Sequence, residues 1–132
     1  MRALLLGAVA FCAMAAPAAA TEWIYCGDAA GHVQIGVLAN FGLFSFSRGT
    51  LRVGSENWST QPEAEPEPAK PMLALESFAD ANQLYVKFAD DQMETILADL
   101  RVVIVTEGDE YVQGGVLDVP GKGAWVVTCE GP

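Results

Sequence analysis

The fold class is decided by residues 102–111, which read VVIVTEGDEY and have the pattern of a β-hairpin. β-branched residues dominate positions 102–105 and favour a strand, while Gly108 and Asp109 supply the residues of a tight turn. Tyr111 begins the returning strand. The stretch therefore predicts two antiparallel strands that are joined at residues 107–110.

The sequence on either side has the same organisation. Val33, Ile35 and Val37 alternate with polar or small residues, and this period of two is typical of a strand with one buried face. Similar runs, separated by turn residues, predict further strands at 23–26, 43–46, 51–53, 72–78, 84–88, 116–119 and 124–129. We therefore predict that residues 21–132 form a single mainly β domain, an antiparallel sandwich or barrel, whose strand order these patterns do not determine.

One segment has a helical pattern. Asp91 is followed three residues later by Glu94, as in a capping box. The apolar residues that follow fall at helical spacing, namely Met93, Ile96, Leu97 and Leu100. These features predict one short α-helix at about residues 91–99. The alternative is a distorted strand that continues into Arg101.

Residues 1–20 have the parts of a secretory signal peptide. Arg2 precedes an apolar run at 3–14, and small residues lead to an expected cut between Ala20 and Thr21. The run is shorter than the roughly 20 residues of a membrane span, so we expect no stable span after cleavage. Cys12 leaves with the signal; lipid attachment there is disfavoured because Phe11 precedes it. We expect an exported protein, periplasmic or secreted, and favour a bacterial source.

Two cysteines remain after cleavage, Cys26 and Cys129, close to the two ends of the domain. In an oxidising compartment, and without a CxxC motif, such a pair predicts a structural disulfide that joins the first and last strands. The closed loop of about 100 residues corresponds to a chain-entropy gain of roughly 4–5 kcal/mol. We also expect Trp23, Tyr25 and Trp125 to cover the bridge.

The charge balance limits the possible partners. Residues 21–132 contain seventeen acidic and six basic side chains, a net charge of −11 that opposes binding to nucleic acids. It favours a cationic envelope or secreted protein. The candidate contacts are Trp58, for which a core position is the alternative, and the acidic turn residues Glu107, Asp109 and Glu110.

A composition change occurs at residues 61–71, where proline and acidic residues predominate. Proline removes backbone donors and like charges repel, so we predict an extended, exposed loop. The loop could be bound by a proline-recognising partner or could act as a tether. Immediately before it, Asn57-Trp58-Ser59 has the N-glycosylation pattern, which matters only in a host that modifies such sites.

Residues for catalysis or for metal binding are scarce. His32 is the single histidine, Gly-x-Ser-x-Gly is absent, and one histidine cannot supply a transition-metal cluster. Asp90, Asp91 and Glu94 could serve a carboxylate-dependent hydrolase. Calcium at residues 107–110 remains an alternative, although the spacing of an EF-hand is absent. We expect no cofactor.

These observations favour a small, acidic, non-enzymatic binding domain of the cell envelope. A narrower version is an inhibitor of a cationic cell-wall hydrolase, because the β-rich plan with terminal cysteines is similar to that of small lysozyme inhibitors. Their Ser/Gly-rich inhibitory motif is not found, so no family is assigned. The alternatives are a structural or assembly role in the envelope and, less favoured, hydrolysis by the carboxylates or through His32.

Overall fold

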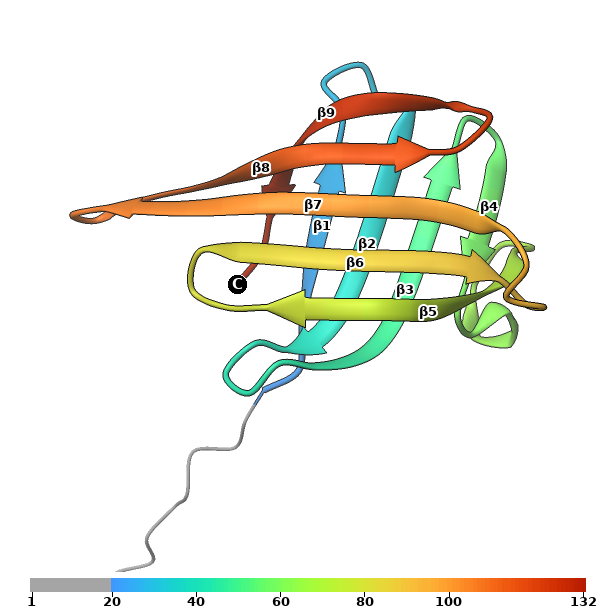
Figure 1. Cartoon of the computed structure of the whole chain (residues 1–132), viewed down its shortest axis with the longest axis horizontal. Coiled ribbons are helices and arrows are strands. Elements are labelled where there is room, and N and C mark those ends of the chain that lie inside the picture. The colour runs from blue at the N-terminus through green and yellow to red at the C-terminus, as the bar shows by residue number, and fades with distance from the viewer. Residues whose placement is uncertain (1–19) are drawn as a thin grey trace, which may run out of the picture.

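A computed structural model describes residues 20–132, which form a closed nine-strand β-barrel (Figure 1). The segment 1–19, with most of the expected signal peptide and Cys12, lies outside the described residues. The strands are β1 (Glu22–Gly27), β2 (Val33–Asn40), β3 (Ser45–Val53), β4 (Glu56–Ser59), β5 (Lys70–Ala79), β6 (Gln83–Asp90), β7 (Ile96–Glu107), β8 (Glu110–Val119) and β9 (Gly123–Glu130). A single 3-10 turn, η1 (Pro62–Ala64), lies between β4 and β5.

Each strand pairs with its neighbours in the sequence, and β9 returns to β1 to close the barrel. The predicted mainly β fold is confirmed, and of the two predicted forms, sandwich and barrel, the protein has the barrel. The sheet is mixed rather than antiparallel throughout, because β4 and β5 run parallel. A parallel pair cannot be joined by a tight hairpin. Residues 60–69 supply the longer connection, which includes η1 and carries the chain back to the starting end of β4.

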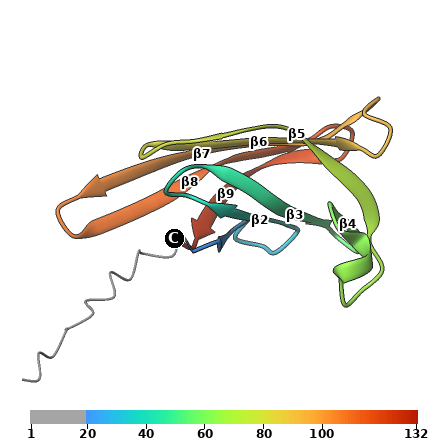
Figure 2. The same ribbon diagram turned by 90° about the horizontal axis from the view of Figure 1, so that it is seen from below.

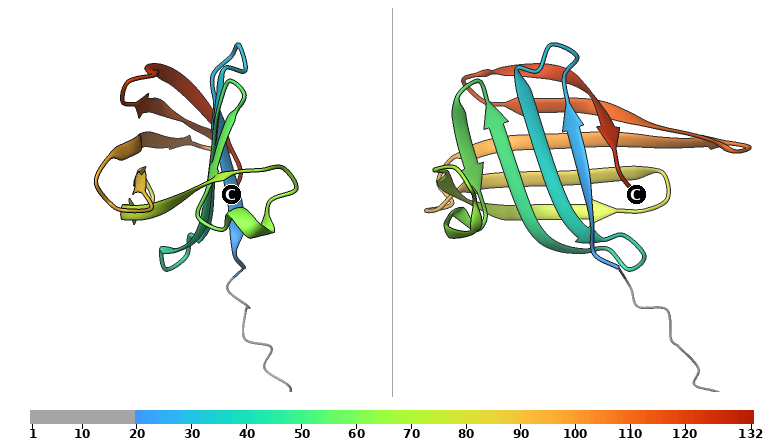
Figure 3. Two further views of the ribbon diagram at one scale, coloured as in Figure 1. Left: turned by 90° about the vertical axis from the view of Figure 1, so that its right-hand side faces the viewer. Right: turned by 180° about the vertical axis from the view of Figure 1, so that it is seen from behind.

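The barrel has two sides, β1–β4 and β5–β9, whose strands cross at a steep angle when viewed from the front or from behind (Figures 1 and 3). Two short seams join these sides. At one, β4 and β5 share two residue pairs; at the other, β1 and β9 share three. The seams are therefore the places where the fewest backbone hydrogen bonds hold the barrel closed.

Alternate residues of the strands fill the barrel. The inward positions of β6 and β7 show the period of two clearly, with Leu84, Val86 and Phe88 facing Ala98, Leu100 and Val102. Gly115 lets β8 lie against β7, since a Cβ atom there would be 1.8 Å from the carbonyl oxygen of Arg101. Close packing of aliphatic and aromatic side chains builds one continuous core.

The α-helix predicted at 91–99 is wrong: residues 91–95 form the turn between β6 and β7, and β7 begins at Ile96. The Glu94 N–H is bound at 2.8 Å by Asp90 rather than by the predicted cap Asp91, and the bond closes a hairpin turn in which Met93 has a φ of 60°. The strand period of Ala98, Leu100 and Val102 prevails over the helical spacing. Within residues 20–132, no helix is long and apolar enough to cross a membrane.

Two other expectations need correction. The strands predicted at 43–46 and 51–53 are not separate: residues 45–46 and 51–53 belong to one strand, β3, whereas Leu43 and Phe44 lie in the turn before it. The short strand β4 is not among the predicted strands. The loop at 61–71 is mostly exposed, as expected, but it is not fully extended, because Pro62–Ala64 make a 3-10 turn. The chain folds back there over the outer face of the barrel.

The disulfide between Cys26 and Cys129 is confirmed, and it lies at the β1–β9 seam, where the two cysteines are directly opposite each other. The expectation that Trp23 and Tyr25 cover it is wrong. Side chains alternate along β1, so Ile24 and Cys26 point into the barrel whereas Trp23 and Tyr25 point outward. This alternation places two aromatic rings on the outer surface.

Candidate functional site

The hairpin of β7 and β8 projects beyond the other strands (Figures 1 and 2). The last pair of β6 with β7 is Gln83 with Val103, and the last pair of β8 with β9 is Gly114 with Thr128. Residues 104–113 therefore extend past both neighbouring strands as a two-stranded projection, here termed the β7–β8 arm. The hairpin predicted from residues 102–111 is the origin of this arm.

The arm has an acidic tip and an apolar outer face. Glu107, Asp109 and Glu110 are all exposed at the tip, and the sequence has no lysine or arginine between Arg101 and Lys122. On the outer face Val105 pairs with Val112, and these side chains are 57% and 66% exposed. Val103, Val116 and Val126 continue this exposed face toward β9.

The root of the arm is held from its inner side. Gln113 is buried and donates a hydrogen bond of 2.6 Å to the carbonyl oxygen of Gly131, while the Tyr111 hydroxyl donates one of 3.0 Å to that of Pro132. Ile104 donates its N–H to the carbonyl of Asn82 at 2.7 Å. These bonds fix the direction in which the arm leaves the barrel.

Trp58, the other residue considered for partner contact, is buried, with 6% of its surface exposed. Its ring lies near the ammonium groups of Lys70 and Lys122, at 5.1 and 5.5 Å from the ring centre. Both lysines form ion pairs with Glu56. Hydrogen bonds from Lys122 and then Lys70 lower the pKa of Glu56 to about 2. Trp58 therefore lies in the core, which was the alternative to its role as a partner contact.

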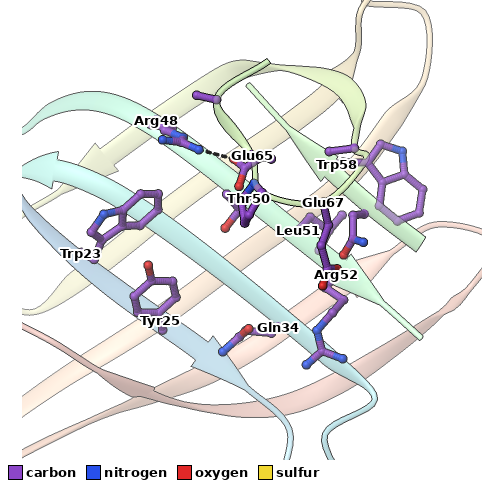
Figure 4. A pocket seen from close by; sticks show the side chains of 14 residues that line it. Trp23, Tyr25, Gln34, Arg48, Thr50, Leu51, Arg52, Trp58, Glu65 and Glu67 are labelled. Carbon is purple, nitrogen blue, oxygen red and sulfur yellow. Dashed lines mark hydrogen bonds and ion pairs between the residues drawn. The ribbon is translucent and has the colours of Figure 1, made fainter. Parts of the chain in front are cut away.

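A second feature, a groove of about 460 Å³, lies on the outer face of β1–β4 (Figure 4). The strand register aligns its floor in three rows. Each row consists of residues that are paired across neighbouring strands. The first row is Trp23, Leu38 and Arg48. The second is Tyr25, Gly36, Thr50 and Ser59, and the third is Gln34, Arg52 and Asn57. Residues 64–69 of the loop after η1 form the opposite wall.

Trp23 and Tyr25 make the aromatic side of the groove. Their rings are stacked, with centres 5.2 Å apart and planes inclined by 12°. The Tyr25 ring lies close over Gly36, because a Cβ atom at that position would be 2.7 Å from Tyr25 Cε1 and from Thr50 Oγ1. Tyr25 remains 41% exposed, so the platform is open to solvent.

Glu65 attaches the loop to the sheet. Its Oε1 atom accepts a hydrogen bond of 2.7 Å from the hydroxyl of Ser59, which is fully buried, and forms an ion pair with Arg48. The Arg48 guanidinium is also 5.8 Å from the centre of the Trp23 ring. Burial would raise the pKa of Glu65, but the bonds from Arg48 and Ser59 outweigh it and hold this pKa below its ordinary value.

Positive and negative side chains are equal in number in the lining of the groove. Arg48 and Arg52, two of the three arginines in residues 20–132, face Glu65 and Glu67 of the loop. The remaining polar lining comes from the uncharged side chains of Gln34, Thr50 and Asn57. A locally neutral, polar and aromatic groove therefore exists on a strongly acidic protein. The N-glycosylation pattern begins within this floor, at the half-buried Asn57 of β4.

The residues considered for catalysis lie at two different turns, His32 between β1 and β2 and the carboxylates between β6 and β7. His32 lies at the β1–β2 turn, where its Nδ1 is 3.1 Å from Asp28 Oδ2. A backbone hydrogen bond from Val33 is the main cause that lowers the pKa of Asp28. Asp90, Asp91 and Glu94 belong to the β6–β7 turn, and backbone hydrogen bonds, chiefly from Glu94, lower the pKa of Asp90.

Metal binding depends on whether several ligand side chains lie close together. Among residues 20–132, no group of three or more histidine, cysteine, aspartate or glutamate side chains is placed to hold a metal ion. Glu107, Asp109 and Glu110 are adjacent at the arm tip but do not converge on one point. The calcium alternative at this turn therefore gains no support from the geometry.

The acidic turn is evident in the sequence, whereas the groove is not predicted from it. Trp23 and Tyr25 alternate with Ile24 and Cys26, a pattern that puts two aromatic residues on the face opposite to the buried cysteine. This alternation is visible in the sequence and could have predicted the aromatic side of the groove. The approach of Arg48, Thr50 and Asn57 to these rings depends on strand order, which the sequence does not determine.

Comparison of the chain with models of known protein families, with curated proteins and with solved structures finds no match. The candidate sites are therefore the two surface features described above, the arm and the groove.

Proposed function

We propose that this protein is an exported, non-enzymatic binding domain of the cell envelope, and that the β7–β8 arm contacts a basic protein. The disulfide indicates an oxidising, extracytoplasmic location. The signal-like residues 1–20 support the narrower proposal of a periplasmic or secreted protein, from a bacterium. The observation that carries the function is the arm, which joins an acidic tip to an exposed valine face and has no basic residue of its own.

The acidic tip favours a cationic partner. Glu107, Asp109 and Glu110 form no ion pair among the described residues, so their charges are free to attract an approaching basic surface. Complementary charges raise the rate of association and act over about 10 Å at 0.1 M salt. We expect the tip to set the on-rate and the salt dependence of binding.

The valine face supplies the contact that persists after encounter. Val103, Val105 and Val112 are exposed side by side on a strand pair whose direction is fixed at its root. Burial of such a face against a partner removes apolar surface from water, which is favourable. A second copy of the same chain is a poorer partner, because both copies would bring an acidic tip and a net negative charge.

The test is binding of the purified protein to two immobilised basic proteins, lysozyme and cytochrome c, at low and moderate salt. The tip variant E107Q/D109N/E110Q is expected to lower the association rate about tenfold at low salt, since steering by charge changes rates by factors of ten or more. The face variant V105T/V112T is expected to raise the dissociation rate instead.

The matched control removes three carboxylates elsewhere: E63Q/E67Q/D91N makes the same change in net charge on exposed residues outside the arm. This control is expected to lower the association rate less than about threefold. Equal effects of the two triple variants would show that net charge alone attracts the probes and would contradict the role of the arm. Failure of the unmodified protein to bind either probe would contradict it as well.

A further inference from the structure

The groove on β1–β4 is separate from the arm and has a different chemistry. Its aromatic side is formed by the stacked rings of Trp23 and Tyr25, and its floor and far wall carry amide, hydroxyl, guanidinium and carboxylate groups. We propose that this groove is a glycan-binding site that takes a sugar unit of a neutral, hydroxyl-rich polysaccharide or oligosaccharide.

The aromatic platform fits a sugar ring. One face of a hexose in its chair form presents C–H groups, while its hydroxyls point outward around the edge. An exposed aromatic ring provides an apolar surface of matching shape, and its negative π face attracts the polarised C–H groups. Tyr25 is 41% exposed, and the absence of a side chain at Gly36 lets its ring lie close to β2. The platform is therefore fixed in place before a ligand arrives.

The polar side chains around the platform suit hydroxyl groups. Gln34, Asn57 and Arg52 lie in one row of the floor, and each ends in a planar group that can bond two neighbouring hydroxyls at once. Thr50 lies in the adjacent row, which also contains Tyr25. Across the groove the loop presents Glu65 and Glu67, whose carboxylates accept hydrogen bonds from hydroxyl donors. Donors and acceptors thus surround an apolar platform.

The charge of the lining argues for a neutral ligand. The two arginines are balanced by two glutamates, and Arg48 is already paired with Glu65. A phosphate or polyanionic ligand would meet both these carboxylates and the net negative charge of the whole protein. An apolar ligand would leave the polar lining without partners, which costs free energy on desolvation. A neutral polyhydroxylated ligand avoids both penalties.

The shape of the groove favours one unit of a longer chain. A volume of about 460 Å³ falls within the range of small-ligand sites, and the groove lies on the outer surface of the barrel. A polysaccharide that places one unit in a surface site of this kind can extend beyond it. In the envelope of a cell, this would attach the domain to a glycan while the arm remains free.

The experiment is a screen of the intact mature protein against an immobilised array of neutral and acidic glycans, followed by calorimetric titration with the soluble form of the best neutral oligosaccharide. We expect binding to neutral members and a change in tryptophan fluorescence on binding. Substitution W23A or Y25A should weaken the affinity at least about tenfold, whereas W23F should retain most of it because the ring is kept.

The control variant is F78A, which removes an exposed aromatic side chain from β5, on the other side of the barrel, and should leave the affinity unchanged. Circular dichroism and the thermal midpoint of each variant show whether it is folded. The inference is overturned if the array shows no neutral glycan bound, if binding is confined to acidic glycans, or if folded W23A and Y25A bind as tightly as F78A. The arm variants E107Q/D109N/E110Q should bind the glycan normally, so this result is independent of the proposal for the arm.

Discussion

Lys122, on the turn between β8 and β9, forms an ion pair with Glu56 on β4, which is 66 residues earlier in the sequence. The same carboxylate binds Lys70 at the start of β5, with Nζ 2.6 Å from Oε2. Both ammonium groups lie over the ring of Trp58. The cluster therefore connects three parts of the chain at the β4–β5 seam, where the backbone supplies two residue pairs.

The cluster predicts a loss of stability in acid. Glu56 has its pKa lowered to about 2, mainly by the hydrogen bond from Lys122 and then by that from Lys70, from an ordinary value of 4.5. A lowered pKa in the folded state stabilises the fold above pH 4.5, and this stabilisation is lost as the pH falls toward 2. Urea unfolding should show E56Q less stable than the unmodified protein at pH 7, with the difference shrinking below pH 4.5.

The control for this pH series is E63Q, which removes a charge from an exposed position of the loop without touching the cluster. A constant difference between E56Q and the unmodified protein across the whole pH range would contradict the assignment.

Removal of the disulfide should destabilise the barrel strongly. The bridge spans 103 residues of sequence and holds the β1–β9 seam. In the chain-entropy model, closing a loop of this length stabilises by roughly 4–5 kcal/mol, and measured values are often smaller. Urea unfolding of C26A/C129A should give a free energy of unfolding lower by about 2–5 kcal/mol. Equal stability with and without the bridge would mean that the seam does not need it.

A methyl group at residue 115 should not be tolerated. The Cβ atom of G115A would lie 1.8 Å from the carbonyl oxygen of Arg101, so β7 and β8 must separate. Overpacking of this kind costs about 1–3 kcal/mol, occasionally more. Thermal unfolding should show a large decrease in the midpoint for G115A and little change for G42A, whose Cβ atom would meet a side-chain oxygen at 3.4 Å. A G115A protein as stable as G42A would contradict the register of this strand pair.

Ser59 should control how firmly the loop is attached. Its buried hydroxyl donates to Glu65 at 2.7 Å and accepts the Gln61 N–H at 3.0 Å, so S59A leaves both groups without these partners. Loss of buried partners costs about 1–3 kcal/mol. Limited proteolysis should cut S59A within residues 61–71 faster than the unmodified protein. S47A, at an exposed position of β3, should be cut at the unmodified rate, and identical digestion of S59A would refute the attachment.

Export can be tested by mass. If the signal is removed as the sequence predicts, intact protein recovered from the cell envelope or medium should begin at Thr21. Its mass should be lower by two hydrogens than that of the reduced chain. A mass that still includes residues 1–20 would contradict cleavage.

The period of two along the strands was sufficient to predict the fold class, the turn residues predicted the hairpin at 107–110, and the two cysteines near the ends of an exported domain predicted the disulfide. It failed where two periods overlap. Residues 96–100 fit both a helix and a strand, and the continuation through Val102 and Ile104 decides for the strand. The helix was predicted from the spacing of residues 93–100 alone, without the residues that follow.

Of the two candidate sites, one could be predicted from the sequence and the other could not. The acidic residues of the arm tip are adjacent in the sequence and were predicted. The groove depends on lateral neighbours: Tyr25, Gly36 and Thr50 meet because β1, β2 and β3 pair in one register. Lateral position follows from strand order and register, and neither can be obtained from the spacing of residues along a single strand.

The two short seams respond to different conditions. A reductant breaks the covalent link between β1 and β9, while acid neutralises the carboxylate that helps to hold β4 to β5. Opening one seam leaves a continuous nine-strand sheet with two free edges. Opening both separates β1–β4, which carries the groove, from β5–β9, which carries the arm. The groove and the arm are thus held in one fixed arrangement by two links of different chemistry, a covalent bond that a reductant breaks and a carboxylate that acid neutralises.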